Sequence, residues 1–152
     1  MLEVINLIRT NSVNGDFKIL VGELDRYLSG VNGDDDDFFR GHNKIDHLNH
    51  VIIAYSEGGA VGCGAFKVTM NKGVEIKRMY IRSEFRGNKI AVRILEELEK
   101  WARNEGFEHV VLETSKEMRS AIQLYRKKDY EVIPNYEPYT NMKSSICFKK
   151  IL

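Results

Sequence analysis

Hydrophobic and polar residues alternate loosely along residues 2–9 (LEVINLIR), with the two-residue period of a β-strand. Residues 50–56 (HVIIAYS) and 60–69 (AVGCGAFKVT) are apolar runs of strand length, and the Glu57-Gly58-Gly59 segment between them is typical of a hairpin turn. The predicted strands cover residues 2–9, 50–56, 60–69, 74–82, 108–113, 130–133 and 145–150.

Other segments carry hydrophobic residues at helical spacing. The strongest runs from 91 to 102, another from 17 to 28, and a third from 118 to 125. Asp16, just before the 17–28 helix, is the predicted cap of its free amide groups. The loop over residues 29–46 is where a short additional helix is expected.

The order of these elements predicts an α/β fold. Three antiparallel strands are followed by a strand–helix–strand crossover from 74–82 to 108–113, which indicates a mixed sheet with helices on its faces. That crossover should be parallel and right-handed. There are no repeats and no Pro/Ser-rich linker, so we expect a single domain over residues 1–152.

Composition narrows the function classes. Lys and Arg together number 23 and Asp and Glu 22, so the charge lacks the basic excess typical of a general nucleic-acid binder. No apolar run approaches the ~20 residues of a membrane span, and the start lacks a signal-peptide pattern. We therefore expect a cytoplasmic protein with no membrane partner. Cys63 and Cys147 lie in strand-like apolar runs and are expected to be reduced core thiols.

The candidate chemistry concentrates where the 74–82 strand passes through a short turn into the 91–102 helix. Backbone N–H groups at a helix start carry partial positive charge and bind anions, phosphates above all. Gly87 allows close backbone approach, while Arg86 and Lys89 add full positive charges. The turn predicts a phosphate site; the alternative is an ordinary turn with two solvated cations.

This turn resembles motif A of the GNAT N-acetyltransferases, Gln/Arg-x-x-Gly-x-Gly/Ala. Arg86, Ile90 and Ala91 fit the pattern, and Lys89 stands where the family usually has its first glycine. A right-handed conformation, as at a first helical position, would let Lys89 fit at little cost and add an ion pair to the pyrophosphate. We expect that conformation; a positive φ would instead weaken the site.

The flanking segments also resemble the family. Residues 75–81 are similar to its fourth strand and 112–114 to its fifth. Residues 121–130 are similar to the helix and turn A-x-x-L-Y-x-K-x-G-F/Y, with Asp129 in place of glycine, and the tail resembles bacterial members. The resemblance covers about the whole chain. It implies the GNAT fold, a central, mixed, mostly antiparallel twisted sheet of about seven strands flanked by about four helices.

The resemblance also implies the reaction and its residues. Glu75 would be the general base acting through water, or else a strand-end glutamate facing solvent. Tyr125 would protonate the coenzyme sulfur, or else only pack in the core. Coenzyme contacts would come from Met79, Tyr80, Ile81, Arg86, Gly87, Asn88, Lys89, Ile90 and Ala91, mostly through the main chain.

Three other groups of residues carry weaker signals. His42, His47 and His50 match no common zinc spacing, so no metal is expected. The acidic run 34–37 has three possible roles: it is solvated, it caps a helix that begins near Phe38, or it attracts a cationic substrate. Three tyrosines are candidates to line the acceptor cleft: Tyr27, Tyr136 and Tyr139. The alternative for each is ordinary partial burial.

Taken with the resemblance, the sequence predicts an N-acetyltransferase. It would transfer an acetyl group from acetyl-CoA to a primary amine of a small molecule or amino-acid-like acceptor by direct attack. The alternatives are a protein or peptide N-acetyltransferase and a non-catalytic acyl-CoA-binding regulatory module. Pairing into a homodimer through the last strands is expected by analogy alone.

Overall fold

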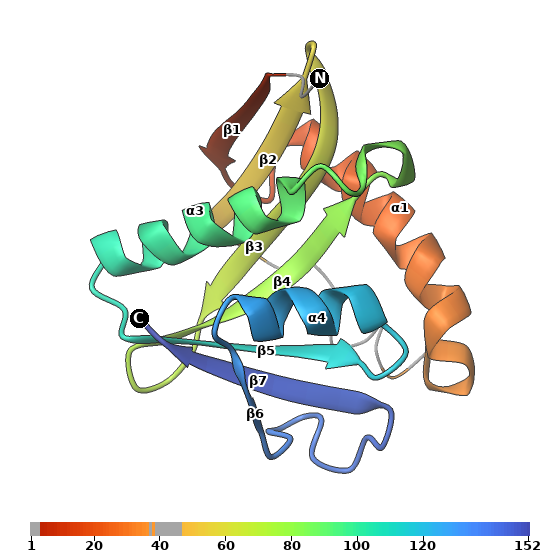
Figure 1. Cartoon of the computed structure of the whole chain (residues 1–152), viewed down its shortest axis with the longest axis vertical. Coiled ribbons are helices and arrows are strands. Elements are labelled where there is room, and N and C mark those ends of the chain that lie inside the picture. The colour runs from red at the N-terminus through yellow and green to blue at the C-terminus, as the bar shows by residue number, and fades with distance from the viewer. Residues whose placement is uncertain (1–3, 37, 39–46) are drawn as a thin grey trace.

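The computed structural model describes residues 4–36, 38 and 47–152 of the chain. Its elements (Figure 1) are β1 (Ile5–Thr10), α1 (Gly15–Asn32), the 3-10 turn η1 (Gly33–Asp35), β2 (His50–Ser56), β3 (Gly59–Val68), β4 (Gly73–Ile81), the 3-10 turn η2 (Ser83–Phe85), α3 (Ile90–Asn104), β5 (His109–Ser115), α4 (Arg119–Lys127), β6 (Glu131–Ile133) and β7 (Ser145–Ile151).

The strands form one seven-stranded sheet in the order β1-β2-β3-β4-β5-β7-β6. All neighbouring pairs are antiparallel except β4 and β5, which are parallel. The mixed sheet and the parallel crossover predicted from the sequence are therefore confirmed. About four helices were expected; the described residues contain three α-helices and two short 3-10 turns.

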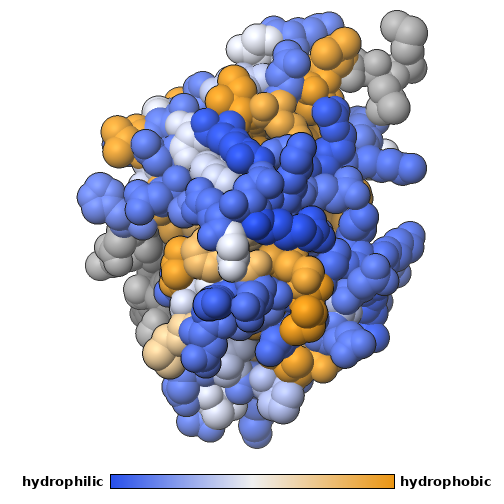
Figure 2. Space-filling model, turned by 90° about the vertical axis from the view of Figure 1, so that its left-hand side faces the viewer, coloured by the Kyte–Doolittle hydropathy of each residue, from blue (hydrophilic) through white to orange (hydrophobic). Residues whose placement is uncertain are grey.

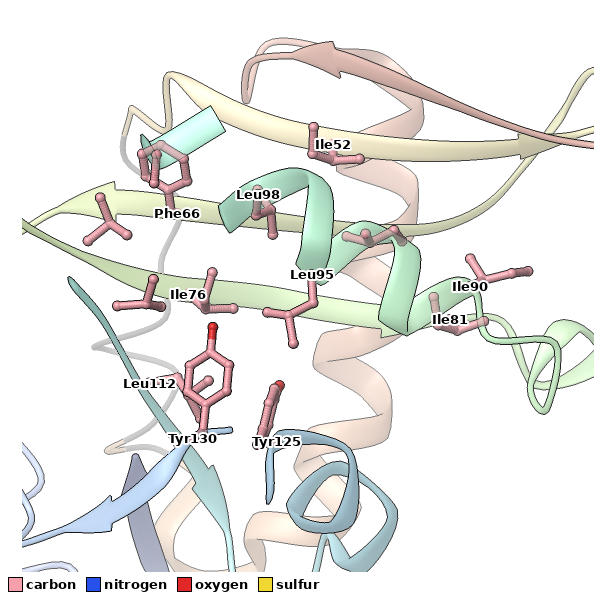
Figure 3. Close-up of a cluster of buried hydrophobic side chains, with 14 of the residues drawn as sticks. Ile52, Phe66, Ile76, Ile81, Ile90, Leu95, Leu98, Leu112, Tyr125 and Tyr130 are labelled. Carbon is pink, nitrogen blue, oxygen red and sulfur yellow. The ribbon is translucent and has the colours of Figure 1, made fainter. Parts of the chain in front are cut away.

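Helices cover both faces of the sheet, as Figure 1 shows. Alternation along β2 explains why, because Val51 and Ile53 pack with α1 whereas Ile52 and Ala54 pack beneath α3. The larger core cluster lies under α3 and α4, and Figure 3 shows its side chains between these helices and the strands of the sheet. Close approach of α3 to β3 depends on Gly64, where a Cβ atom would lie 2.8 Å from Ile94.

The start of α1 corrects one expectation. Asn14, not Asp16, caps the helix, since its side chain accepts a hydrogen bond from the Phe17 amide at 3.1 Å. Asp16 lies within the first turn and accepts a hydrogen bond from the Tyr55 hydroxyl at 2.6 Å. The helix therefore begins two residues earlier than the hydrophobic pattern predicted, because the cap depends on backbone geometry and not on hydrophobic spacing.

One further expectation is confirmed, and the position of Asp129 finds an explanation. Cys63 and Cys147 are buried free thiols. Asp129, which replaces a family glycine, has the left-handed φ of 71° that the turn after α4 requires.

Hydrophilic side chains cover most of the face shown in Figure 2, with hydrophobic ones in short strips between them. None of the helices in the described part of the chain is long and apolar enough to cross a membrane. Val132 and Ile151, on the last two strands, are well exposed. That is the region where homodimer pairing was predicted, and the pairing stays a prediction.

Candidate active site

A cleft opens where β4 and β5 separate. The two strands pair only at Gly73 with His109, Val74 with Val110 and Glu75 with Val111. Beyond these pairs, residues 76–81 of β4 and 112–115 of β5 diverge into the two arms of a V. Between the arms lies a cavity of about 700 Å³ lined by residues of α1, β4, β5, α4 and the turn before α3.

A bulge in β4 sets which groups face the cleft. Arg78 has a φ of 60°, and the register with β3 shifts between Cys63 and Ala65 at the same level. The Arg78 side chain is buried and forms an ion pair with Asp25 of α1 at 2.6 Å. After the bulge, Met79 packs on the α3 side of the sheet. The bulge therefore bends the end of β4 away from β5 and leaves its backbone beside the cavity.

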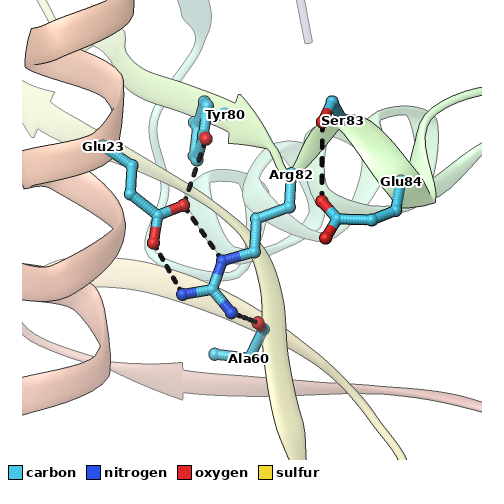
Figure 4. A network of polar contacts seen from close by, with 6 residues as sticks. All are labelled: Glu23, Ala60, Tyr80, Arg82, Ser83 and Glu84. Carbon is cyan, nitrogen blue, oxygen red and sulfur yellow. Dashed lines mark hydrogen bonds and ion pairs between the residues drawn. The ribbon is translucent and has the colours of Figure 1, made fainter.

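Figure 4 shows how α1 is fixed to this end of β4. The Glu23 carboxylate accepts hydrogen bonds from the Arg82 guanidinium at 3.0 and 2.7 Å and from the Tyr80 hydroxyl at 3.1 Å. The hydrogen bonds from Arg82 hold the pKa of Glu23 below its ordinary value. Arg82 also donates to the carbonyl oxygen of Ala60 in β3 at 2.9 Å. The network thereby joins α1, β3 and the end of β4.

Glu75 lines the cleft and is only 5% exposed, so it is not a strand-end glutamate facing solvent. The Tyr136 hydroxyl donates a hydrogen bond to its carboxylate at 2.9 Å. Burial, followed by the charge of Glu75, raises the pKa of Tyr136, so this tyrosine keeps its proton and continues to donate. The ammonium groups of Lys77 and Lys67 each lie 3.8 Å from the Glu75 carboxylate.

A second carboxylate, which the sequence analysis did not single out, lies on the other arm of the V. Glu113 of β5 lines the cleft and accepts a hydrogen bond from the Ser145 hydroxyl at 2.7 Å. Burial raises the pKa of Glu113, and the Ser145 hydrogen bond opposes that shift. Alternation along β5 could have identified Glu113 from the sequence. Leu112 faces the core, so its neighbour Glu113 must face the opposite side of the sheet.

The start of α3 lies at the other end of the cleft. No side chain caps this helix, and its first turn holds no acidic residue, whereas α1 is capped by Asn14. The unpaired amide groups are therefore available to an anion. Of the predicted residues in this turn, Arg86, Gly87, Lys89, Ile90 and Ala91 line the cleft. Asn88 is not among the lining residues and donates to the Phe85 carbonyl oxygen at 3.2 Å.

Lys89 corrects the expected conformation. It is the N-cap of α3, with φ 60° and ψ 21°, and is left-handed where a right-handed conformation was predicted. This is the positive φ that was expected to weaken the phosphate site. The conformation differs from the prediction because the helix begins one residue later, at Ile90, so Lys89 need not have helical dihedrals. Its carbonyl oxygen accepts the first helical hydrogen bond, from Arg93 at 3.1 Å. The side chain of Arg86 is held by the Ile81 carbonyl oxygen at 2.9 Å and lies over the ring of Tyr27.

Tyr125 of α4 is part of the core and also lines the cleft. Figure 3 shows its ring beside that of Tyr130, and the two ring centroids are 5.7 Å apart. Burial, with a contribution from Glu113, raises the pKa of Tyr125. Its hydroxyl has no hydrogen-bond partner among the described residues, so it is free to donate into the cleft.

The fold and the site can be compared with known proteins. The sequence profile of the acetyltransferase (GNAT) family matches residues 20–130. An IAA acetyltransferase from Azospirillum brasilense is 31% identical over 135 residues, which cover 88% of each chain. The chain belongs to the GNAT acetyltransferase family.

Solved structures support this assignment. A Klebsiella pneumoniae protein assigned as an acyl-CoA N-acyltransferase superposes on this GNAT chain with a TM-score of 0.82 and 25% identity, and 98% of each chain is covered. The PaiA N-acetyltransferase of Thermoplasma acidophilum, solved with coenzyme A, superposes with a TM-score of 0.70 and 15% identity over 98% and 99% of the two chains. The latter likeness concerns the fold alone. GNAT enzymes use acetyl-CoA, and this chain is an N-acetyltransferase of that family.

The remaining predicted residues lie as follows in this GNAT structure. Tyr27 and Tyr139 line the cleft. Tyr136 is not among the lining residues, but its hydroxyl donates a hydrogen bond to Glu75, which is one of them. His50 pairs with Glu105 and stacks on Phe66, away from the cleft.

No group of three or more metal-ligating residues occurs within residues 4–36, 38 and 47–152. In the acidic run, Asp35 accepts a hydrogen bond from Ser144 and Asp36 one from Ser29. His42 and Asp37 lie outside the described residues.

Proposed function

We propose that this enzyme transfers an acetyl group from acetyl-CoA to the primary amine of a small molecule or amino-acid-like acceptor by direct attack. The observation that supports this best is the separation of β4 from β5 after three residue pairs, which opens one cleft with carboxylates at one end and an uncapped helix start at the other. Each end suits one of the two substrates. The carboxylates suit the amine of the acceptor, and the uncapped helix start suits the pyrophosphate of acetyl-CoA.

In the proposed arrangement, the main chain holds acetyl-CoA. Amide groups from Gly87 through Ala91 bind the pyrophosphate, and the side chains of Arg86 and Lys89 add charge. Asn88 contributes only its backbone, and the Arg86 amide already donates to the Ser83 carbonyl oxygen. The backbone of Met79, Tyr80 and Ile81 binds the pantetheine arm in the manner of an added strand, and an amide there stabilises the negative oxygen that develops in the tetrahedral intermediate. No metal takes part in this proposal.

The side chains of the cleft move the protons. An alkylamine has a pKa near ~10.4 and reaches the cleft protonated, so a carboxylate must remove its proton. Glu75, oriented by Tyr136, is the proposed base, and Glu113 is the second candidate because it faces the same cleft. Tyr125 retains its proton and donates it to the departing thiolate. The amine nitrogen bonds to the acetyl carbon and forms the tetrahedral intermediate, and the carbon–sulfur bond breaks as this intermediate collapses. The second proton lost by the attacking nitrogen returns to Tyr125 and replaces the one given to the thiolate.

A small acceptor is favoured for two reasons. The Azospirillum relative is named for IAA, and both carboxylates lie in a cavity bounded by α1 and the loop between β6 and β7. Acetylation of a protein or peptide amine is the alternative within the same chemistry. The whole chain, residues 1–152, acts as the catalytic domain in this proposal.

The test is release of coenzyme A thiol from acetyl-CoA with a panel of primary amines, for wild type, Glu75→Gln and Glu113→Gln. If Glu75 is the base, its variant loses about 10²-fold or more in kcat and retains acetyl-CoA binding. Glu113→Gln then has the smaller effect. The reverse order would move the role to Glu113, and turnover of lysine-containing peptides alone would favour the protein-directed alternative.

A further inference from the structure

Lys77 is an amine enclosed in the cleft itself. Its side chain is 13% exposed and lines the cavity. Its ammonium group donates one hydrogen bond, to the Tyr139 hydroxyl at 3.2 Å, and no other within the part of the chain that the structure describes. An ammonium group carries three N–H donors. Two of the donors of Lys77 therefore remain available to a ligand.

None of the carboxylates in the described part of the chain lies within hydrogen-bond distance of the Lys77 ammonium group. Glu75 lies at 3.8 Å, beyond hydrogen-bond distance, and its carboxylate is already bound by Tyr136. Glu113 faces the same space, while Lys67 and Arg78 oppose the charge of Lys77. Burial is the largest cause that lowers the pKa of Lys77. A buried ammonium is costly unless it is paired and fully hydrogen-bonded, so an anion in the cleft would relieve that cost.

Glu75 and Lys77 project from β4 on the same side of the sheet, with opposite charges 3.8 Å apart. A free α-amino acid has the matching pair, because its amine and its carboxylate are attached to one carbon. With the amine at Glu75, the carboxylate comes within reach of the two available donors of Lys77. A simple amine has no group for these donors, and an amide offers them a neutral carbonyl oxygen without the negative charge of the carboxylate.

We propose that Lys77, with Tyr139 beside it, binds the carboxylate of the acceptor, and that the acceptors of this enzyme are free α-amino acids. The proposal rests on the proposed function, since it assigns the acceptor of the same cleft. Lys77 is thus a specificity-determining residue, and the reaction consumes acetyl-CoA and an α-amino acid and yields the N-acetyl amino acid and coenzyme A.

The experiment compares matched acceptors. Each common α-amino acid is assayed beside its amide, which keeps the amine but has no negative charge, and beside its decarboxylated amine. Thiol release from acetyl-CoA gives kcat/KM for each. We expect the best free acid to exceed its own amide and amine by on the order of tenfold or more, because a site built for a polar group rejects analogues that lack it.

Variants of two lysines separate specificity from structure. Lys77→Met should remove the preference for the acid over its amide, mainly through KM for the acid, and Lys77→Arg should restore part of it. Lys67→Met is the matched control: Lys67 lies at the same 3.8 Å from Glu75, but it is 52% exposed and outside the cavity lining. That variant should keep the preference. Thermal unfolding confirms that each variant is folded.

The outcomes distinguish the two proposals. Amides or simple amines accepted as well as the acids would overturn the role of Lys77 and leave the proposed function intact. A preference for acids that survives in Lys77→Met would also overturn it. Bound acetyl-CoA without turnover of any compound in the panel would refute the small-amine function as well.

Discussion

Lys89 has a left-handed backbone at the N-cap of α3. For a residue with a Cβ atom this conformation costs about 1–2 kcal/mol, because the Cβ approaches the following carbonyl oxygen. Lys89→Gly should therefore raise the free energy of unfolding by about 1 kcal/mol, measured by urea denaturation without ligand. Its affinity for acetyl-CoA should fall, since a cation at the cleft is lost.

Lys72 offers a matched control for that substitution. It too has a φ of 60°, but it lies in the exposed turn between β3 and β4. Its ion pair with Glu108 is solvent-exposed and contributes little. Lys72→Gly should be stabilising to a similar extent and leave acetyl-CoA affinity unchanged. A similar loss of affinity in both variants would contradict a role for Lys89 in coenzyme binding.

The raised pKa of Glu113 predicts that the stability of the protein depends on pH. Its pKa in the folded protein lies above the ordinary 4.5, so between these two values the folded state binds more protons than the unfolded state. Stability then falls as pH rises through this window. Glu113→Gln removes that contribution, so its stability relative to wild type should increase from pH 4 to pH 7. Urea unfolding at a series of pH values measures it, and a constant difference would refute the shift.

Tyr125→Phe tests the proposed acid. Loss of the hydroxyl should lower kcat by about 10²-fold with little change in KM for acetyl-CoA, since only proton donation is removed. Tyr130→Phe is the control, because its hydroxyl donates to Glu99 at 2.7 Å and its ring packs against Tyr125. That change should lower stability and leave kcat close to wild type. Equal losses of kcat would mean that Tyr125 acts through packing.

At the scale of elements, the loop between β6 and β7 is organised by one side chain. The Asn135 amide donates to the carbonyl oxygens of Tyr139, Met142 and Ser145 at 3.2, 3.1 and 3.2 Å. Asn135→Ala should cost about 1–3 kcal/mol, because buried carbonyl groups lose their partners. It should also raise KM for the acceptor, since the loop holds Tyr136 against Glu75.

The same loop contains an exposed asparagine for comparison. Asn141→Ala should change neither the free energy of unfolding nor KM, as measured by urea denaturation and thiol release. If Asn135→Ala destabilised the protein without affecting KM for the acceptor, the loop would not position the acceptor site.

The elements themselves were largely predictable, because hydrophobic periodicity and turn residues are local signals. The bounds of β2 coincide with the predicted 50–56, and the other described strands differ by one or two residues at most of their ends. The bulge at Arg78 was not predictable, since its positive φ depends on pairing with β3 and on the ion pair to Asp25. Asn14 was missed as a cap for a different reason: Asn14 and Asp16 are both favoured cap residues, and backbone geometry decides which of them caps the helix.

The site was predictable in part. Glu75, Tyr125 and the turn before α3 belong to local motifs, and all of these except Asn88 line the cleft. Tyr136 meets Glu75 from 61 positions away, and Lys77 meets Tyr139 from 62. Contacts across such separations depend on the path of the C-terminal loop, which no spacing rule describes.

At the scale of the whole molecule, the sheet is held together at its centre by only three β4–β5 residue pairs. A ligand that fills the V should protect the open backbone from hydrogen exchange. On addition of acetyl-CoA, we expect slower amide exchange in residues 76–81 and at the start of α3, and unchanged exchange in residues 73–75. Protection confined to other parts of the protein would contradict the proposed coenzyme site.

Binding should also appear in thermal stability. Acetyl-CoA at about 100 times its Kd stabilises the folded state by about 2.7 kcal/mol, which raises Tm by several degrees. The double variant Arg86→Ala, Lys89→Glu should show a smaller rise. An equal rise in both proteins would place the coenzyme elsewhere.

The two ends of the cleft differ in the kind of group they present. The proposed coenzyme contacts are mostly main-chain amides at the end of β4 and the start of α3, which survive most amino-acid replacements. The proposed acceptor contacts are side chains of Glu75, Lys77 and the loop that holds Tyr139. Over generations, a descendant of this gene could therefore exchange one acceptor for another by a few substitutions at these positions, and inherit its acyl donor unchanged.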